Sequence, residues 1–438
     1  MQGVFGTRRL FSNLSSANRT CLYDFHLKNG AKMVGFAGFA MPGQYDLSVS
    51  ASVLHTRSNV SLFDVSHMLQ TEISGKHREE FIESLTPADV ANLPENSGVL
   101  SVLTNPSGGI IDDLIISKTS QDSLFLVTNA GRIGSRLALF GSILKWRSLT
   151  TVIHSNAFKK NAAEWRSNGK EVQVNALGDR ALIAVQGPEM MKLMESETDV
   201  SLDSLFFMQS SVGKVCGVGN CRVTRCGYTG RGRSGGNWHF EKCPKNGRCV
   251  FLQISVSVEA AKNVVERLLS SKAAQLKLAG LGARDVLRME AGLCLFGNDI
   301  DEGTTPVEAG IAFVIAKRRR QTLGFPGAER IIQQLEKKDF ARKRVGFVST
   351  KVGKASRSNM AIVSPVSKAS VGIVTSGCPS PTLGKNIAMG YVDKASAKVG
   401  NVLAVETGPE RLNEVEVVKL PFVRSAYYLR PTVEGKKK

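Results

Sequence analysis

The chain has 438 residues, of which 42% are hydrophobic and 22% are charged, and its formal net charge is +19. These proportions are typical of a globular protein, and no apolar run is long enough to span a membrane, so we expect no membrane partner. The length exceeds the usual size of one hydrophobic core and predicts two or three domains.

The first 21 residues have the composition of a mitochondrial presequence. They contain Arg8, Arg9 and Arg19 together with several serines, and the first acidic residue of the chain is Asp24. Mitochondrial targeting segments are amphipathic, rich in arginine and serine, and poor in acids. We therefore expect residues 1–21 to be a presequence and the protein to reside in the mitochondrial matrix. The alternative is a disordered tail.

A turn followed by two adjacent carboxylates lies between residues 103 and 116. Asn, Pro, Ser and two glycines lead into an apolar, β-branched run, which Asp112 and Asp113 interrupt near its start. This pattern predicts a hairpin tip that enters a strand. Successive side chains of a strand point to opposite faces, so one carboxylate can face the interior while the other is solvated. The alternative is that both acids close a surface turn.

The five cysteines between residues 216 and 249 raise the question of a zinc site. The chain has eight cysteines, and this group lies close to His239. Structural zinc sites usually contain paired ligands in a tight knuckle, and no Cys-x-x-Cys pair is present. We therefore expect no metal. Reduced thiols fit a matrix enzyme better than a disulfide framework does.

Two helices can be placed from their apolar spacing. Phe81, Ile82 and Leu85 mark an amphipathic turn that ends before Pro87, because proline cannot continue a helix. Ser257 is a suitable N-cap for a second helix. Its apolar residues then fall on one face at a spacing of 3.6, namely Val258, Ala261, Val264, Val265 and Leu268.

The densest basic cluster is Lys317-Arg318-Arg319-Arg320. Such a run can bind nucleic-acid phosphates, but no interleaved aromatic residues or recognised nucleic-acid motif accompany it. We expect a solvated basic loop and no nucleic-acid partner.

The pattern changes beyond residue 342. Short β-rich runs at residues 345–348, 371–375, 387–392 and 414–418 are separated by Gly, Ser, Pro and Lys. Such runs predict a small barrel or sandwich, and the basic segment 337–344 is the expected linker before it. From periodicity alone, the chain is α+β followed by a β module.

A series of motifs occurs in the order found in one enzyme family. The motifs include Asp64-Val65-Ser66-His67-Met68, Gly108-Gly109-Ile110-Ile111-Asp112-Asp113-Leu114, and residues 22–26, 36–38, 128–131, 186–188, 226–230, 282–285, 290–293, 297–299, 305–308, 375–377 and 389–391. From about residue 22 to residue 428, with two interruptions, the chain resembles the aminomethyltransferases, which are the T-proteins of the glycine cleavage system.

The resemblance implies an α+β fold with three domains around a central folate channel, the last of them a small Greek-key β-barrel. Residues 22–335 would form two intertwined folate-binding domains, and residues 343–430 would form the barrel. The implied reaction transfers the methylene carbon of an aminomethyl group to tetrahydrofolate, the co-substrate, and releases ammonia. The implied partners are the lipoylated H protein, which carries that group, and the other glycine cleavage subunits. A folate with a polyglutamate tail, or an acidic carrier protein, would account for the basic charge.

Such a reaction requires positioning and a negative group near the positive charge that develops. The family assigns this role to the second carboxylate of the pair, so we expect Asp113 to be catalytic, with Asp112 as the alternative.

The resemblance also implies four substrate-binding residues. Arginine suits a planar acceptor, so Arg284 is expected to contact substrate; the alternative is an ion-pair network with Asp285, Arg288 and Glu290. Tyr427 resembles a tyrosine that reaches back into the substrate site; its alternative role is to anchor the last strand. Met68 and Asn129 resemble the lining of a pterin pocket, through soft apolar contact and amide hydrogen bonds respectively. Ordinary core and turn roles are their alternatives.

Two stretches depart from the family pattern, near residues 134–155 and 231–252. Gln253 follows the second stretch, at the place of a folate-binding glutamate. Glutamine still forms hydrogen bonds but brings no charge to the donor edge of a pterin, so we expect weak folate binding. Each stretch is either a genuine loop or translated intervening sequence.

Other proteins on this fold give the rival interpretations. These are a folate-binding but catalytically impaired homologue and a folate-dependent iron–sulfur assembly factor. The assembly factors carry a Lys-Gly-Cys signature, which is missing from this sequence. Dimethylglycine and sarcosine oxidising enzymes carry a flavin domain, for which the chain has no room.

Overall fold

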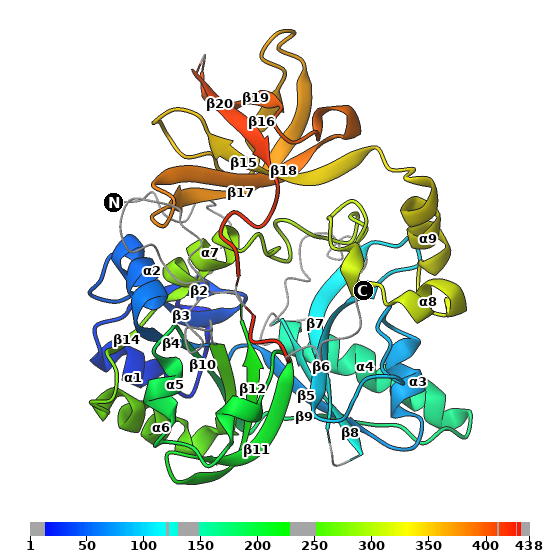
Figure 1. The fold of residues 1–438 in the computed structure, drawn as a ribbon. Helices are drawn as coiled ribbons and strands as arrows, with labels where there is room; N and C mark the ends of the chain where they lie inside the picture. Colours follow the sequence, from blue (N-terminus) through cyan, green and yellow to red (C-terminus); the bar gives the residue numbers. More distant parts are fainter. Residues whose placement is uncertain are drawn as a thin grey trace.

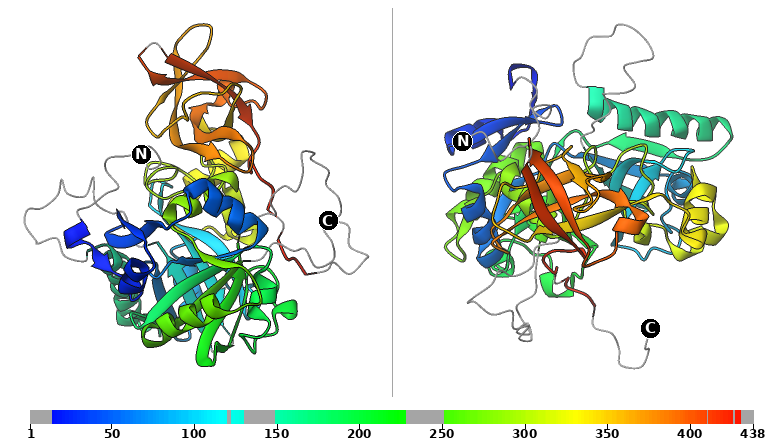
Figure 2. Two further views of the ribbon diagram at one scale, coloured as in Figure 1. Left: turned by 90° about the vertical axis from the view of Figure 1, so that its left-hand side faces the viewer. Right: turned by 90° about the horizontal axis from the view of Figure 1, so that it is seen from above.

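The computed structural model describes residues 14–119, 122–129, 149–227, 251–409, 411–425 and 427–430, with the backbone alone at 149–157. Three parts lie around a common centre, namely the two halves of a large sheet with their helices and a barrel above them (Figure 1). A view from the side shows the same barrel, coloured yellow to red, at one end of the molecule (Figure 2). The predicted α+β class with a terminal barrel is confirmed. No helix in the described ranges is long and apolar enough to cross a membrane.

Part of the predicted presequence packs on the body of the protein. Residues 1–13 lie outside the described residues, but Thr20 is buried and its hydroxyl donates to the Asp64 carboxylate at 2.8 Å. A small sheet begins in the same segment, in the order β1 (Asn18–Arg19), β3 (Phe39–Gln44) and β2 (Lys32–Phe36). We propose that the mature chain keeps residue 18 onward, because cleavage at residue 21 would remove these contacts.

The large sheet has two halves joined at one paired position, Gln209 with Ser97. The first half contains, in order, β14 (Leu276–Leu278), β4 (Val60–Asp64), β10 (Arg180–Gln186), β13 (Phe251–Ser257), β12 (Val218–Cys226) and β11 (Gln209–Val215). The second contains β6 (Ser97–Thr104), β7 (Ile110–Lys118), β8 (Ser123–Thr128), β5 (Leu69–Ser74) and β9 (Gln173–Ala176). The chain enters the first half, crosses to the second and returns, so the two halves are intertwined.

Helices bury apolar stripes against both halves. The predicted second helix is α6 (Val258–Ser270), with Ser257 at its N-cap position but without a side-chain capping bond. Its predicted apolar face is confirmed, since four of the five residues are fully buried against the first half and Val258 is partly buried. The first predicted helix is α3 (Arg78–Glu83), which covers the second half together with α4 (Leu149–Ser167). The remaining helices of this region are α1 (Tyr23–Lys28), α2 (Val49–Ser58), α5 (Met190–Met194), α7 (Leu281–Glu290), α8 (Lys317–Thr322) and α9 (Ala328–Lys337).

The C-terminal β module is a closed barrel. Its strands run in the order β15 (Arg342–Ser349), β18 (Lys385–Asp393), β17 (Ser370–Ser380), β16 (Ala361–Val363), β19 (Val402–Gly408) and β20 (Arg411–Val418). The four predicted β-rich runs fall in β15, β17, β18 and β20. Sequence reasoning missed β16 and β19. The junction between α9 and β15 lies inside the predicted linker.

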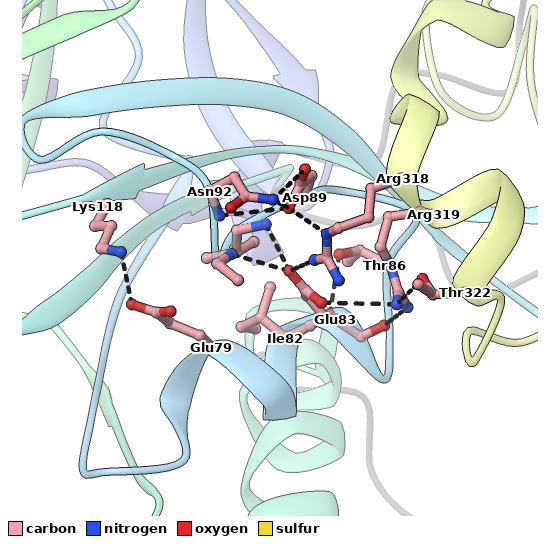
Figure 3. A network of polar contacts seen from close by, with 12 residues as sticks. Glu79, Ile82, Glu83, Thr86, Asp89, Asn92, Lys118, Arg318, Arg319 and Thr322 are labelled. Atoms are coloured by element: carbon pink, nitrogen blue, oxygen red, sulfur yellow. Dashed lines mark hydrogen bonds and ion pairs between the residues drawn. The ribbon is translucent and has the colours of Figure 1, made fainter.

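The basic cluster at residues 317–320 is not a solvated loop, so that prediction is wrong. It forms α8, whose arginines fasten this helix to α3 (Figure 3). Arg318 pairs with Glu83 and donates to Asp89 at 2.7 Å, and Arg319 donates to the Glu83 carbonyl at 2.6 Å. Because the acidic partners lie more than 200 residues earlier in the chain, the local sequence could not reveal this packing role.

Buried charges connect α7 to α2 and to the barrel. Glu290 and Arg57 are 0% and 1% exposed, and Arg57 Nε donates to the Glu290 carboxylate at 2.8 Å. The same carboxylate accepts the hydroxyls of Ser380 at 2.5 Å and Thr382 at 2.9 Å from the barrel. A paired and hydrogen-bonded buried charge is tolerated, whereas an unpaired one is costly. Glu290 therefore joins the sheet region to the barrel.

We predict that Glu290→Ala destabilises the protein, because Arg57 remains buried without its carboxylate. The free energy of unfolding should fall by about 3–5 kcal/mol in urea titrations. Glu266→Ala is the matched control, since Glu266 forms an exposed ion pair with Lys262 at 3.9 Å, and it should change the value by no more than about 0.5 kcal/mol. Equal losses in the two variants would contradict the joining role.

Candidate functional site

The turn before the two aspartates is the predicted hairpin tip. The Asn105 side-chain oxygen accepts the N–H groups of Ser107 at 3.0 Å and Gly109 at 2.9 Å, which closes the turn. A Cβ at Gly109 would lie 1.7 Å from the Glu302 carbonyl oxygen, so only glycine permits this close approach. The turn is therefore shaped by its own asparagine and by the loop after α7.

A β-bulge sets the directions of the two aspartates. Leu103 pairs with Asp112, and the next pair joins Thr104 to Ile110, which leaves Ile111 as the additional residue on β7. Asp112 faces α3 and α4 with Leu103 and is 0% exposed. Asp113 lies opposite Val102 on the other face, towards the centre of the molecule, and is partly exposed. The prediction that the two acids point apart is confirmed, and the interior acid is Asp112.

One amide group connects both carboxyls. Asn129, directly after β8, donates from Nδ2 to Asp112 Oδ1 at 2.9 Å and to Asp113 Oδ1 at 2.8 Å. Its backbone N–H approaches Asp112 Oδ2 at 3.3 Å. The predicted site residues Asp113 and Asn129 are therefore in direct contact.

Burial changes the acidity of the pair. It raises the pKa of Asp112 well above its usual range, and the negative charge of Asp113 raises it further. Burial also raises the pKa of Asp113, against the lowering effect of the hydrogen bond from Asn129. Two adjacent carboxyls resist simultaneous ionisation, so Asp112 keeps its proton to higher pH and Asp113 carries the charge.

Arg284 on α7 is not part of the ion-pair network that its neighbours form. Arg288 pairs with Asp285 at 2.8 Å, and Glu290 pairs with Arg57. Arg284 Nη1 is buried and has no hydrogen-bond partner among the described residues. The guanidinium therefore retains a donor for a ligand.

His67 is a site candidate that sequence reasoning missed, although it stands inside a motif quoted above. It is 7% exposed, its ring packs edge-on against Phe36 at 5.5 Å, and its Nδ1 lacks a partner within the described ranges. Burial lowers the pKa of His67 to about 4, and the charge of Arg284 contributes to the lowering while that of Asp64 opposes it. The imidazole is therefore neutral at neutral pH. Met68, the next residue, packs against the central hydrophobic cluster that also includes Cys226, Leu287 and Met389.

The C-terminal segment reaches the centre from the barrel side. Figure 1 shows it in red, running from the barrel down to β11 and β12. Tyr427 is 42% exposed and packs on Phe207 with a ring distance of 4.3 Å. Tyr428 stacks on Phe206 at 5.2 Å, lies over Arg225, and donates its hydroxyl to the Asp203 carbonyl at 2.7 Å. Tyr428 is thus the anchor of the segment, and Tyr427 has a partly free ring.

Comparison with known proteins identifies the family. The model described as the GCVT N-terminal domain matches residues 22–232 and 252–319, and the glycine cleavage T-protein C-terminal barrel domain matches residues 342–424. The chain belongs to the aminomethyltransferases, the T-proteins of the glycine cleavage system. The resemblance predicted from the sequence is therefore confirmed, and the two matched domains agree with the sheet region and the barrel described above.

Relatives of this aminomethyltransferase family cover nearly the whole chain. Human mitochondrial aminomethyltransferase is 44% identical over 94% of this chain and 91% of its own length. The potato (Solanum tuberosum) enzyme is 40% identical over 96% of this chain and 93% of its own length. The crystal structure of glycine cleavage system aminomethyltransferase T from Bartonella henselae has a TM-score of 0.79 and 31% identity, and the match covers 94% of this chain and 100% of that one.

The interruption in the aminomethyltransferase match agrees with the departure at residues 231–252. Residues 228–250 lie outside the described residues, but Phe251 and Leu252 belong to β13 and are buried, so the strand includes the last two residues of the expected stretch. Gln253 is 8% exposed, pairs with Thr224 and lies near Cys226 on the central face.

Two other expectations lie partly outside the described residues. Residues 134–148 of the first departing stretch lie outside the described residues, as do Cys243, Cys249 and His239 of the cysteine cluster. In the ranges that the structure describes, no group of three or more His, Cys, Asp or Glu residues could hold a metal ion.

Proposed function

We propose that Asp113 is the catalytic carboxylate of an aminomethyl transfer from the lipoyl arm of the glycine cleavage H protein to tetrahydrofolate. Family membership makes the chain a tetrahydrofolate-dependent aminomethyltransferase of the glycine cleavage system, and its relatives from animals, plants and yeast place it in mitochondria. The relatives do not favour the impaired homologue or the iron–sulfur assembly factor.

The bonds that change define what the site must supply. The methylene carbon loses its bonds to sulfur and to the amino nitrogen, and it gains bonds to two folate nitrogens. The two protons lost by these nitrogens balance the thiol and the ammonia that are released. Positive charge develops on the carbon as either group departs, so a fixed negative charge beside it lowers the barrier. A carboxylate can also receive a proton from the folate amine.

The direction and acidity of Asp113 carry this assignment. Of the two acids, Asp113 is the one that faces the centre and is partly exposed. Its raised pKa makes it a stronger base than an ordinary aspartate. The burial of Asp112 on the opposite face argues against the alternative assignment.

The substrate-binding roles proposed for other residues have separate support. The free donor of Arg284 suits a planar acceptor of the folate or a carboxylate. Met68 offers soft apolar contact at the edge of the central cluster, and Tyr427 keeps part of its ring exposed. Asn129 already uses its amide nitrogen on the aspartates, so its role is to hold Asp113, with its amide oxygen left for the pterin.

We predict that Asp113→Asn lowers kcat by about 100-fold or more, because the neutral amide neither stabilises developing positive charge nor accepts a proton. Ammonia release from aminomethylated, lipoylated H protein and tetrahydrofolate measures the turnover, and calorimetry measures folate binding, which should persist. Asp112→Asn makes the same change on the other face of the strand but keeps a hydrogen-bond acceptor there, so its kcat should stay within about threefold of the original chain. Normal turnover by Asp113→Asn would remove the assignment.

We also predict that Gln253→Glu strengthens tetrahydrofolate binding about tenfold, because a charged acceptor forms a stronger hydrogen bond with the donor edge of a pterin. Isothermal titration calorimetry on the full chain provides the dissociation constants. The exposed Gln275→Glu substitution adds the same charge away from the centre and should leave the affinity unchanged. The idea fails if Gln253→Glu binds no more tightly than the original chain.

A further inference from the structure

Asp112 is a buried acid that the proposed chemistry does not use. It is 0% exposed and faces the apolar cluster beneath α3 and α4, whereas Asp113 faces the centre. A side chain in this position cannot touch a substrate bound at the centre. Nevertheless, both of its carboxyl oxygens are directed at Asn129, the residue that also binds Asp113.

We propose that Asp112 and Asn129 are positioning residues, which together fix the orientation of the Asp113 carboxyl from the far face of β7. This inference rests on the proposed catalytic role of Asp113. It assigns to the first acid of the pair a function without substrate contact, and to the asparagine a function in addition to its proposed contact with the pterin.

The hydrogen-bond geometry carries the inference. A side-chain amide has two N–H donors in one plane. The distances of 2.9 Å to Asp112 Oδ1 and 2.8 Å to Asp113 Oδ1 assign one donor to each acid. Asp112 therefore sets the plane of the amide, and the amide directs one hydrogen at Asp113. The hydrogen bond from Asn129 falls on Asp113 Oδ1, which leaves Oδ2 as the oxygen directed to the reacting groups.

The burial of Asp112 determines the form in which it acts. Its pKa is raised by burial and by the charge of Asp113, so it acts in its neutral form and leaves the single negative charge on Asp113. A neutral carboxyl still offers Oδ1 as an acceptor to the Asn129 amide. Asparagine at position 112 would keep that acceptor with nearly the same shape, whereas leucine would keep only the volume.

The test measures kcat and the KM for tetrahydrofolate in full-length variants. Asp112→Leu and Asn129→Ala should each lower kcat about 100-fold, because a misplaced carboxylate loses reactive geometry. The KM should change less than about twofold in Asp112→Leu, whereas Asn129→Ala also removes the amide oxygen proposed for the pterin and should raise the KM. Unlike Asp112→Leu, Asp112→Asn should keep kcat within about threefold of the value for the original chain. The double variant Asp112→Leu/Asn129→Ala should fall no further than either single variant, because both remove the same restraint.

Thr128→Ala is the matched control. Thr128 is fully buried next to Asn129 on the same face as Asp112, and its hydroxyl lacks a hydrogen-bond partner in the described part of the chain. This variant should keep kcat unchanged. Thermal unfolding of every variant separates loss of folding from loss of positioning, and if Asp112→Leu does not fold, Asn129→Ala decides alone.

The possible outcomes separate the two proposals. If Asn129→Ala keeps normal kcat while Asp113→Asn loses turnover, the positioning role is overturned and the catalytic role stands. If Asp112→Asn loses as much kcat as Asp112→Leu, the account of Asp112 as a neutral acceptor is wrong. If Asp113→Asn itself keeps normal turnover, the proposed function fails.

Discussion

The hydrogen bonds from one amide, that of Asn129, hold together two adjacent acids that the pleat of β7 turns to opposite faces. This arrangement leaves the pair with one negative charge, on the partly exposed Asp113. One acid is enclosed in an apolar cluster and retains its proton to higher pH, while the other faces the centre and carries the negative charge. Two solvated carboxylates on a surface turn would repel each other weakly and would have ordinary acidity.

Contacts with the surrounding fold hold β7 and its turn in place. The loop after α7 approaches Gly109, and Ile110 donates its N–H to the Thr304 carbonyl at 3.0 Å. Asp299 fastens the same loop to α7, because its carboxylate accepts a hydrogen bond from Arg288 Nη1 at 2.6 Å. It also fastens the loop to the barrel, because its carbonyl accepts the Tyr391 hydroxyl at 2.6 Å. The position of the aspartates therefore depends on contacts among all three parts of the molecule.

Local patterns in the sequence predicted the elements whose stability is local. The turn at Asn105 closes on its own side chain, and the face of α6 follows helical spacing, so both were predictable from neighbouring residues. Distant contacts were not. Arg318 meets acids more than 200 residues away, and the two bonds of Asn129 require β7 and β8 to be paired. For His67, the motif was visible, but the burial that makes it neutral arises only from the fold.

The most direct test of the central claim is a carbon-13 NMR titration of the aspartate side-chain carboxyls, with Asp112→Asn and Asp113→Asn variants to assign the two signals. The account predicts that the Asp112 carboxyl stays protonated well above pH ~4, where ordinary aspartates ionise, and that Asp113 loses its proton at a lower pH than Asp112 does. An Asp112 carboxyl that ionises at or below the ordinary aspartate range, or before Asp113, would contradict the account.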